Sequence, residues 1–542
     1  MATLTQPARE ANRTAGNRIV VNPPDQFTNE PMIDWTNPEN LRRMQAAIDK
    51  VRSELGREYD LVIGGRRIKT GDTSPSVNPA KPSQIVGLHH QAGPAEVEPA
   101  MQAALKAFET WSCTSVEERT QLLFRVGQIL EERKFELEAW LVFEVGKNYV
   151  EADADIAELI DFCHMYALEA LHLDQVKTAV QLPGEHDQFR YIPLGVGAEI
   201  SPWNFPAAIR GGMTLASIVS GNAVILKPSG DSPTIAAKFM EILEEAGLPD
   251  GVVNYCPGHG VDFGSAVVAH PKTRYIAFTG SKEVGLHINQ TAATQQPGQI
   301  WIKRTILEMG GKDSMVVDAD ADFDSAVEGT AQAAFGFSGQ KCSACSRIIV
   351  DERIYDRFIQ ALKARVEKIT VGDPTTNPGM GPVINEKSMK SILGYIEKGI
   401  AEGGKLLVDG RQTRVADRPN GYFVGPTVFD DVSMKMAIGH DEIFGPVASI
   451  APAKTLEDAI AMMKSHPNAN ATSIFTSSGK AAREFAKHAT ASMVGVNIGV
   501  AAPMAYFPFG GAKDSFFGDL KAHGRDGFEF YTDKKVTISR WF

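Results

Sequence analysis

The sequence predicts an α/β protein built on parallel sheets. Between about residues 195 and 285, short apolar runs alternate with segments of helical periodicity. The candidate strands are 223–226, 252–253 and 275–278. Strands that are apolar on both faces, with helices between them, are typical of a parallel sheet covered on both sides. A second alternation starts near residue 315, and 542 residues are enough for two or three cores.

Ahead of these strands, the chain begins with a predicted N-terminal arm over residues 1–55. Its first 30 or so residues are polar and include Asn22-Pro23-Pro24-Asp25, which favours a mobile or partner-wrapping segment over packed core. Farther along, Ser115-Val116-Glu117-Glu118 is a capping box, and apolar residues follow it at helical spacing. A long amphipathic helix is therefore expected from residue 116.

Two segments do not follow the alternating pattern. One is 179–193, with a turn at Pro183-Gly184, and the other lies at the end of the chain, where Lys535–Phe542 alternates with period two. Strands this remote from the main sheets leave open edges unless they pair with each other and then with another subunit. We therefore expect a homo-oligomer.

The bulk composition favours a small-molecule enzyme. A net charge of −11 and a pI near 5.6 argue against a nucleic-acid partner, which needs a basic face. Five cysteines are too few for a disulfide framework in so long a chain. No apolar run reaches the roughly 18 residues of a membrane span, and the first residues lack the apolar core of a signal peptide. We expect a cytoplasmic protein without a membrane partner.

The most informative residue is Cys342, within the polar, glycine-flanked stretch Gly336–Arg347. A reactive thiol needs access, and nearby dipoles or positive charge lower its pKa from about 8.5. We expect Cys342 to meet these conditions and to act as a nucleophile. Cys345 completes a Cys-x-x-Cys, but without a second pair or a histidine cluster we interpret it as a packing residue. His89-His90 is interpreted as a solvated pair, and no metal site is predicted.

Five further motifs accompany Cys342. They are Ile200–Pro206, Gly221–Ser229, Phe278–Gly285, Leu307–Lys312 and Glu442–Val447. In this order and at these separations they resemble the NAD(P)-dependent aldehyde dehydrogenase superfamily, over roughly residues 60 to 540. The resemblance implies a Rossmann-type cofactor domain (56–178 and 194–305), an α/β catalytic domain (306–505) and a small β oligomerisation element with a substrate loop (179–193 and 506–542).

Within the superfamily, the motifs point to two groups. The arm, Gly336–Arg347 and Gly310–Asp313 look like the L-glutamate γ-semialdehyde (1-pyrroline-5-carboxylate) dehydrogenases. The tail Ala502–Gly518 looks more like the methylmalonate-semialdehyde dehydrogenases, which pass an acyl group to coenzyme A. Those relatives lack a glutamate at the position of Glu308, so Glu308 favours hydrolysis.

The predicted catalytic residues are Cys342, Asn204 and Glu308. A Cys342 thiolate adds to an aldehyde carbonyl, and the resulting oxyanion needs donors. The side-chain amide of Asn204 and the backbone N–H of Cys342 suit this because neither requires a buried charge. Glu308, beside two glycines, is the candidate general base that activates water against the thioester.

The predicted cofactor is NAD. After strand 275–278, Gly280-Ser281 opens a helix whose free N–H groups favour a pyrophosphate. By resemblance, Lys227 meets the adenosine ribose, Glu442 holds the nicotinamide ribose and Phe444 packs on the ring. The remaining residues that we assign to this site are Ser201, Pro202, Trp203 and Gly285. Gly230 stands where NAD users often carry an acid, which leaves NADP as an alternative.

The expected substrate is an acidic aliphatic semialdehyde, with L-glutamate γ-semialdehyde named from the resemblance and proline breakdown as its context. Ser343, Gly511 and Ser515 are the predicted substrate-binding residues. Two alternatives stay open, a coenzyme-A-acylating dehydrogenase of the methylmalonate type and a non-catalytic scaffold that retains the fold.

Overall fold

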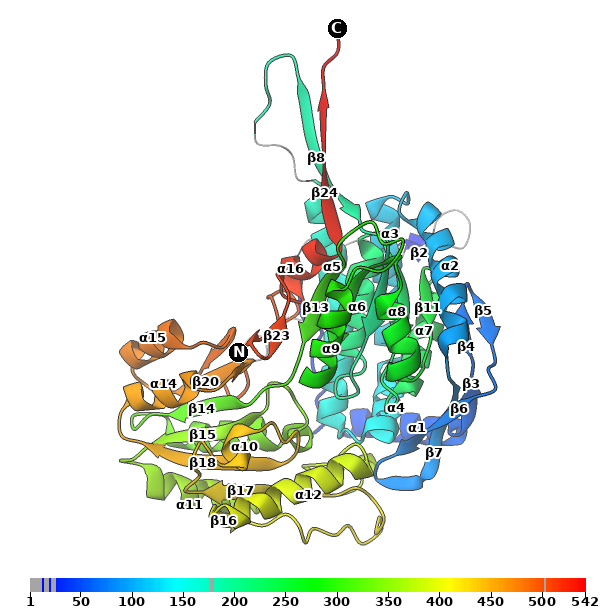
Figure 1. The fold of residues 1–542 in the computed structure, drawn as a ribbon. Coiled ribbons are helices and arrows are strands. Elements are labelled where there is room, and N and C mark those ends of the chain that lie inside the picture. The colour runs from blue at the N-terminus through cyan, green and yellow to red at the C-terminus, as the bar shows by residue number, and fades with distance from the viewer. Residues whose placement is uncertain (1–11, 14–18, 21–25, 176–179, 502–503) are drawn as a thin grey trace.

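Two lobes, each built on its own sheet, make up the body of the molecule, and a two-stranded ribbon projects from it (Figure 1). This computed structural model describes residues 12–13, 19–20, 26–175, 180–501 and 504–542. Most of the first 25 residues of the predicted arm, and Ala502 and Pro503 of the tail motif, lie outside the described residues.

The first lobe contains an eight-stranded sheet in the order β23-β13-β12-β9-β10-β11-β4-β5. Its strands are β4 Leu61–Ile63, β5 Arg66–Ile68, β9 Val196–Ile200, β10 Ala223–Lys227, β11 Val253–Tyr255, β12 Thr273–Thr279, β13 Arg304–Glu308 and β23 Phe516–Phe517. The central strands from β11 to β13 are parallel, and β10 is buried along its whole length. The expected parallel sheet is confirmed, because only strands apolar on both faces can be covered by helices on both.

Helices cover this sheet and join its strands. They are α2 Pro94–Trp111, α3 Val116–Glu132, α4 Lys134–Val145, α5 Tyr149–Asp174, α6 Ala208–Val219, α7 Pro233–Glu245, α8 Ser265–Ala269 and α9 Lys282–Ala293. Helix α3 begins where the capping box predicts it, with the Ser115 side chain accepting from the backbone N–H of Glu118 at 3.2 Å. A smaller sheet of β3 Arg57–Tyr59, β7 Lys81–His90 and β6 Thr73–Asn78 flanks the lobe.

The second lobe contains a seven-stranded sheet in the order β16-β17-β18-β15-β14-β20-β21. Its strands are β14 Asp313–Val317, β15 Cys345–Asp351, β16 Lys405–Val408, β17 Thr427–Asp430, β18 Val447–Ala453, β20 Ala471–Phe475 and β21 Met493–Val496, and its helices are α10 Phe323–Phe335, α11 Tyr355–Val366, α12 Glu386–Ala401, α13 Ala437–His440, α14 Leu456–Lys464 and α15 Gly479–His488. Cys345 is 3% exposed at the start of β15, as expected for a packing residue. Only residues 309–312 separate β13 of the first sheet from β14 of the second.

The ribbon consists of β8 (His186–Pro193) and β24 (Thr532–Ser539), which pair antiparallel from Pro193↔Thr532 to His186↔Ser539. The predicted pairing of the two remote segments is thereby confirmed. A short helix, α16 (Gly524–Phe530), leads into β24. Figure 1 shows the ribbon standing clear of both lobes.

The described part of the arm is attached to the first lobe rather than free. The backbone N–H groups of Glu30 and Ile33 donate to carboxylates of α5, at 2.6 Å to Asp161 and 2.7 Å to Asp153. Helix α1 (Pro38–Glu54) then packs its buried face against α4. The expectation of an unpacked segment is thus wrong for its last residues, Asn29 and Glu30, because the Asp161 carboxylate of α5 binds both of them.

Two further findings concern the whole chain. None of the helices in the described ranges has the length and apolar character that crossing a membrane requires. All five cysteines are free thiols. The cytoplasmic compartment stays a prediction.

A buried ion pair supports the loops that will form the site. Lys147 Nζ lies 2.8 Å from Asp155 Oδ2, and both side chains have no solvent exposure. The second oxygen of Asp155 accepts from the backbone N–H of Ala208 at 2.8 Å, at the start of α6. The Lys147 ammonium lies 4.2 Å from the ring centre of Phe205 and 4.8 Å from that of Phe337. One cation therefore contacts the segments that precede α6 and Cys342.

We predict that Lys147→Met lowers the stability of the first lobe by about 3–5 kcal/mol, because it leaves the Asp155 carboxylate buried without its partner. The measurement is the midpoint of urea denaturation. Lys50→Met, which removes the exposed Lys50–Glu136 pair, is the control and costs about 1 kcal/mol or less. Equal midpoints for the two variants would contradict the assignment.

Candidate active site

A cavity of about 880 Å³ lies where the two lobes meet, and most of the predicted site residues line it. From the first lobe come Ser201, Pro202, Trp203, Asn204, Lys227, Gly280 and Ser281, and from the second come Cys342, Glu442 and Phe444. The segments that contribute are the ends of β9, β10 and β12, the start of α9 and the loops around Cys342 and Phe444. Carboxyl ends of parallel strands are where α/β proteins bind ligands.

The loop before Cys342 has an unusual backbone. Phe337 and Ser338 have φ values of 51° and 53°, a left-handed conformation that L-residues rarely adopt. The surroundings hold it in place, because the N–H of Phe337 donates to Glu151 at 2.6 Å and the Ser338 hydroxyl donates to the Gly381 carbonyl at 2.9 Å. Strain of this kind collects at functional sites.

The thiol of Cys342 opens onto the cavity but is only 8% exposed. Burial raises its pKa well above the ordinary value, and the carboxylates of Glu308, Asp313 and Glu442 raise it further. The expected lowering of this pKa is therefore wrong. The polar glycine-rich stretch folds into a compact loop that excludes water, and the charges that face the sulfur are negative. Ionisation of Cys342 thus requires a base that takes its proton.

Asn204 is fixed beside the Cys342 loop. Its side-chain Nδ2 donates to the carbonyl of Gln340 at 3.2 Å, and the residue is 4% exposed. Gln340 is itself held, since its side-chain oxygen accepts from the N–H of Ile384 at 2.9 Å. An amide nitrogen carries two hydrogens, so Asn204 retains one donor for an oxyanion in the cavity.

Glu308 ends strand β13 and is 2% exposed. Its two oxygens accept from Asn470 Nδ2 at 2.5 Å and from the backbone N–H of Gly511 at 3.1 Å. Burial raises its pKa to about 8, with these two hydrogen bonds acting in the opposite sense. Glu308 lines a separate cavity of about 20 Å³ together with Thr279 and Phe509, which is room for one water molecule. A carboxyl group with this pKa is suited to proton transfer near neutral pH.

Two glycines after Glu308 let the lobes approach. A Cβ at Gly310 would collide with the carboxylate of Glu442, and one at Gly311 would collide with the backbone carbonyl of Cys342. The Gly311 N–H donates to Glu442 at 2.8 Å, while burial raises the pKa of Glu442 to about 7. The glycines therefore serve close contact between segments rather than a turn.

Three of the lining residues suit a dinucleotide. Ser281 caps α9 with φ −69°, and its hydroxyl accepts from the N–H of Val284 at 3.4 Å. Ser201 is 4% exposed, and its hydroxyl has no hydrogen-bond partner among the residues with described positions, so a ligand group can satisfy it. Burial lowers the pKa of Lys227 to about 8.

Two aromatic rings also line the cavity. Phe444 has φ 55°, and its ring meets that of Trp203 edge to face at 5.5 Å between centres. The same cavity is lined by the Glu442 carboxylate and the Cys342 thiol. Aromatic rings suit contact with a flat ring, and a carboxylate suits the hydroxyl groups of a ribose.

Besides Glu308, four predicted residues lie outside the lining of the large cavity. Gly285 allows α9 to pack, because a Cβ there would meet the sulfur of Met309 at 2.6 Å. Ser343 is 7% exposed next to the nucleophile. Gly511 contacts Glu308 as described, and the fully buried Ser515 accepts through its hydroxyl from the N–H of Ala469 at 3.0 Å. The substrate-binding roles of these tail residues stay predictions.

The tail is nevertheless part of the site. Strand β23 pairs antiparallel with β13, which places Phe516 opposite Glu308 and Phe517 opposite Leu307. The Met309 N–H donates to the carbonyl of Ser515 at 2.9 Å. Sequence reasoning missed the residues that hold the catalytic groups in place, namely Lys147, Gln340, Asn470 and Lys521. Gln340 and Asn470 bind residues that are more than 100 positions away in the sequence, Asn204 and Glu308. No local sequence pattern predicts contacts of this kind.

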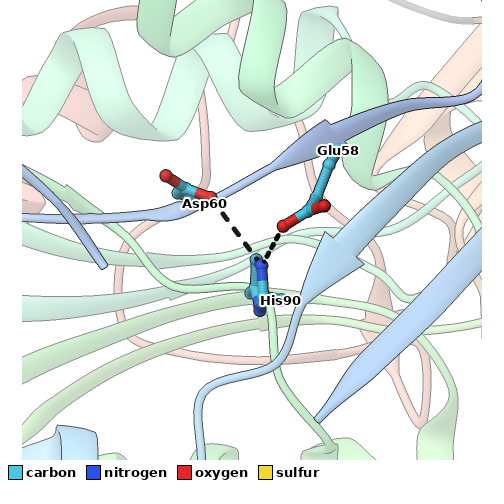
Figure 2. A group of neighbouring side chains, drawn as sticks. All are labelled: Glu58, Asp60 and His90. Atoms are coloured by element: carbon cyan, nitrogen blue, oxygen red, sulfur yellow. Dashed lines mark hydrogen bonds and ion pairs between the residues drawn. The ribbon is translucent and has the colours of Figure 1, made fainter. Parts of the chain in front are cut away.

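The histidine pair of β7 is buried, contrary to our expectation. His89 has no exposure and stacks on Tyr59 at 4.8 Å, and His90 is 5% exposed. Figure 2 shows His90 facing Glu58 and Asp60, at 2.7 Å and 3.8 Å. These three ligand types gather closely enough for a metal ion, but Lys69 already pairs with Glu58 at 2.7 Å. The cluster is explained as an ion-pair network.

Comparison with known proteins places the site in context. The family model described as "Aldehyde dehydrogenase family" matches residues 67–537. The 1-pyrroline-5-carboxylate dehydrogenase of Geobacillus thermodenitrificans is 45% identical over 519 residues, covering 95% of this chain and 99% of the relative. That of Halalkalibacterium halodurans, numbered 1, is 42% identical over 528 residues, with coverage of 95% and 99%.

Solved structures agree. The 1-pyrroline-5-carboxylate dehydrogenase from Thermus with bound NAD superposes with a TM-score of 0.92 at 40% identity, covering 95% of this chain and 99% of that one. The methylmalonate-semialdehyde dehydrogenase of Oceanimonas doudoroffii gives 0.84 at 34% identity, covering 90% and 98%. Both groups named by the motifs therefore appear among its relatives, and the predicted fold class is confirmed. The extent of the family match and of these identities shows that the chain belongs to the aldehyde dehydrogenase family.

Proposed function

We propose that this enzyme oxidises L-glutamate γ-semialdehyde to L-glutamate with NAD, as a step of proline breakdown. The observation that carries the proposal is the placement of Cys342 and Asn204 on one cavity with Glu442 and Phe444, in a chain that is 45% identical to a 1-pyrroline-5-carboxylate dehydrogenase. Ser201, Lys227 and the start of α9 hold the adenosine and pyrophosphate portion, and Glu442 and Phe444 hold the nicotinamide portion.

The first step is addition of Cys342 Sγ to the aldehyde carbon. Because burial raises the pKa of the thiol, the proton must pass to a base as the S–C bond forms, and Glu308 supplies that base. The carbonyl π electrons move to oxygen, where the free Asn204 N–H and the Cys342 backbone N–H stabilise them. When bound, NAD supplies the acceptor for the hydride that leaves this adduct.

Hydrolysis completes the reaction. Oxidation of the adduct leaves the acyl group on Cys342 as a thioester. Glu308 first releases the thiol proton to solvent and is a carboxylate again. It then takes a proton from a water molecule as the water oxygen bonds to the acyl carbon, the C–S bond breaks with its electron pair on the Cys342 sulfur, and L-glutamate departs. The cavity of about 20 Å³ beside Glu308 has room for this water.

The competing reading is transfer of the acyl group to coenzyme A. It is favoured by the tail and by the similarity to methylmalonate-semialdehyde dehydrogenase. Glu308 argues against acyl transfer to coenzyme A. Its buried carboxyl group lines a cavity that has room for one water molecule, and a carboxylate in that position activates water for hydrolysis. NADP is the competing cofactor, and Gly230, where an added Cβ meets nothing within 4 Å, leaves room on the cavity wall for a 2′-phosphate.

We predict that L-glutamate γ-semialdehyde is oxidised with NAD in the absence of coenzyme A, with a kcat/KM above those of uncharged aldehydes of equal length. NADH formation is measured at 340 nm across such a panel, with NAD or NADP and with or without coenzyme A. Strict dependence on coenzyme A would replace hydrolysis with acyl transfer. If no aldehyde of the panel leads to reduction of NAD or NADP, the non-catalytic scaffold is favoured.

We predict that Glu308→Gln forms at most one NADH per active site, more slowly than the unaltered enzyme, and then stops, because the amide can neither take the Cys342 proton nor activate water. In the unaltered enzyme the pKa of Glu308 is about 8, so its basic form grows as the pH rises through 8 and the steady-state rate rises with it. The measurement is stopped-flow NADH formation between pH 6 and 9. Sustained turnover of Glu308→Gln would contradict the role of Glu308.

We also propose that the β8–β24 ribbon joins subunits of a homo-oligomer. Val536 and Ile538 of β24 are 67% and 68% exposed, and Trp541 is 85% exposed. In the described part of the chain, β24 pairs only with β8, which leaves free edges on a projecting ribbon (Figure 1). Such an edge is normally covered.

We predict that Val536→Asp combined with Ile538→Asp lowers the molar mass by multi-angle light scattering toward 58.8 kDa, because two charges are placed on the contacting face. Thr537→Asp, on the other face of the strand, is the matched control and retains the larger mass. An unaltered enzyme that already elutes at the mass of one chain would refute the assembly.

A further inference from the structure

Lys521 lies at the base of the loop between Phe509 and Ala522 and binds the loop backbone. The N–H of Phe509 donates to the carbonyl of Ala522 at 2.6 Å, which brings the two ends of the loop together. Next to this closure, Lys521 Nζ donates to the carbonyl of Gly511. The ammonium also lies 4.1 Å from the ring centre of Phe516, the residue opposite Glu308 in the β13–β23 pair.

Gly511 links this lysine to the candidate base. Its carbonyl accepts from Lys521, and its N–H donates to Glu308 Oε2 at 3.1 Å. The Ser492 hydroxyl donates to the same carbonyl at 2.9 Å. The Gly511 carbonyl and the Gly511 N–H belong to adjacent peptide units joined at Cα, so the two donors on the carbonyl fix the position of the N–H that faces Glu308. A change at Lys521 is therefore transmitted to the carboxylate of Glu308.

The charges around Glu308 give the lysine a second effect. From the second lobe, Glu442, Asp313 and the Cys342 thiol face Glu308, and a negative charge on any of them opposes its ionisation. Asn470 is neutral, whereas the positive charge of Lys521 favours the carboxylate form.

Within the part of the chain that the structure describes, the ammonium of Lys521 forms no ion pair. It is partly buried, and no carboxylate oxygen of the described residues lies within ion-pair distance of its nitrogen. Its backbone N–H, by contrast, donates to Asp526 at 3.2 Å. A cation that is placed over an aromatic ring and bonded to a neutral carbonyl is not accounted for by a surface salt bridge.

We propose that Lys521 is a positioning residue for the hydrolytic step, which fixes the Gly511 peptide against Glu308 and stabilises the Glu308 carboxylate through its charge. This inference rests on the proposed role of Glu308 as the base. It adds to the active site a residue of the tail, 213 positions away from Glu308 in the chain.

The test isolates hydrolysis from hydride transfer. p-Nitrophenyl acetate acylates a reactive thiol without a redox step, so the steady release of p-nitrophenolate after the burst reports the hydrolysis of the acyl-Cys342 thioester. Its rate is measured between pH 6 and 10 for the unaltered enzyme and for Lys521→Met, Lys521→Arg and Lys513→Met. Methionine keeps the unbranched side chain over Phe516 but removes the charge and the donor.

For Lys521→Met we expect the midpoint of the rising limb to move to higher pH by about one unit, because the carboxylate loses a favourable charge. Below that midpoint the rate falls about tenfold. Lys521→Arg keeps the original midpoint. Lys513→Met is the matched control on the same loop, since Lys513 Nζ donates to the carbonyls of Lys464 and His466, both at 2.9 Å, and it keeps the original midpoint too.

An unshifted midpoint in Lys521→Met overturns the inference, even if the rate falls, because loss of structure alone changes the amplitude and not the midpoint. An equal shift in Lys513→Met overturns it as well. If Lys521→Met does not fold, judged by its thermal midpoint, Lys521→Gln takes its place with the same expectation. Unchanged hydrolysis in Glu308→Gln would instead refute the proposed function, which keeps the two failures distinguishable.

Discussion

The close approach of the Gly310-Gly311 backbone to the Cys342 loop and to Glu442 is the contact on which the rest of the site depends. Residues 309–312 join β13 of the first large sheet directly to β14, a central strand of the second, so the two strands converge there. A side chain at either glycine would occupy the positions of the Glu442 carboxylate or the Cys342 carbonyl. The lobes can therefore bring thiol and carboxyl groups together only because Gly310 and Gly311 have no Cβ atoms.

Burial at this crossover sets the chemistry. The same exclusion of water raises the pKa of Cys342 and of Glu308, so burial favours the neutral form of both groups. The thiol becomes nucleophilic as its proton is transferred, and the base stays in the range where it can both accept and release a proton. The tail takes part in this balance, because β23 lies directly on β13 and supplies the Gly511 N–H. The tail, whose sequence looks like that of the methylmalonate-semialdehyde dehydrogenases, therefore forms a wall of the site rather than a remote appendage.

The features predicted from sequence were those with local causes. The capping box at Ser115 and the doubly apolar strand Ala223–Leu226 follow from neighbouring residues, and both are found where expected. The motifs also predicted Cys342, Asn204 and Glu442 as residues of one site, and all three line the large cavity. The environment of Cys342 could not be predicted, because its high pKa comes from carboxylates on other segments and from the folding of a polar stretch into the interior. The contact between Lys521 and Gly511 depends on how the tail closes on β13, and the burial of His89 depends on Tyr59, 30 residues earlier.

The most direct test of covalent catalysis by Cys342 is tandem mass spectrometry of the peptide that contains it. The enzyme is mixed with NAD and L-glutamate γ-semialdehyde and quenched in acid within the first turnover, which preserves a thioester. The account predicts a glutamyl mass increment on Cys342, absent from Cys345 in the same peptide and absent when NAD is omitted and the adduct reverses. NADH formation with an unmodified Cys342, or with the increment on another residue, would contradict it.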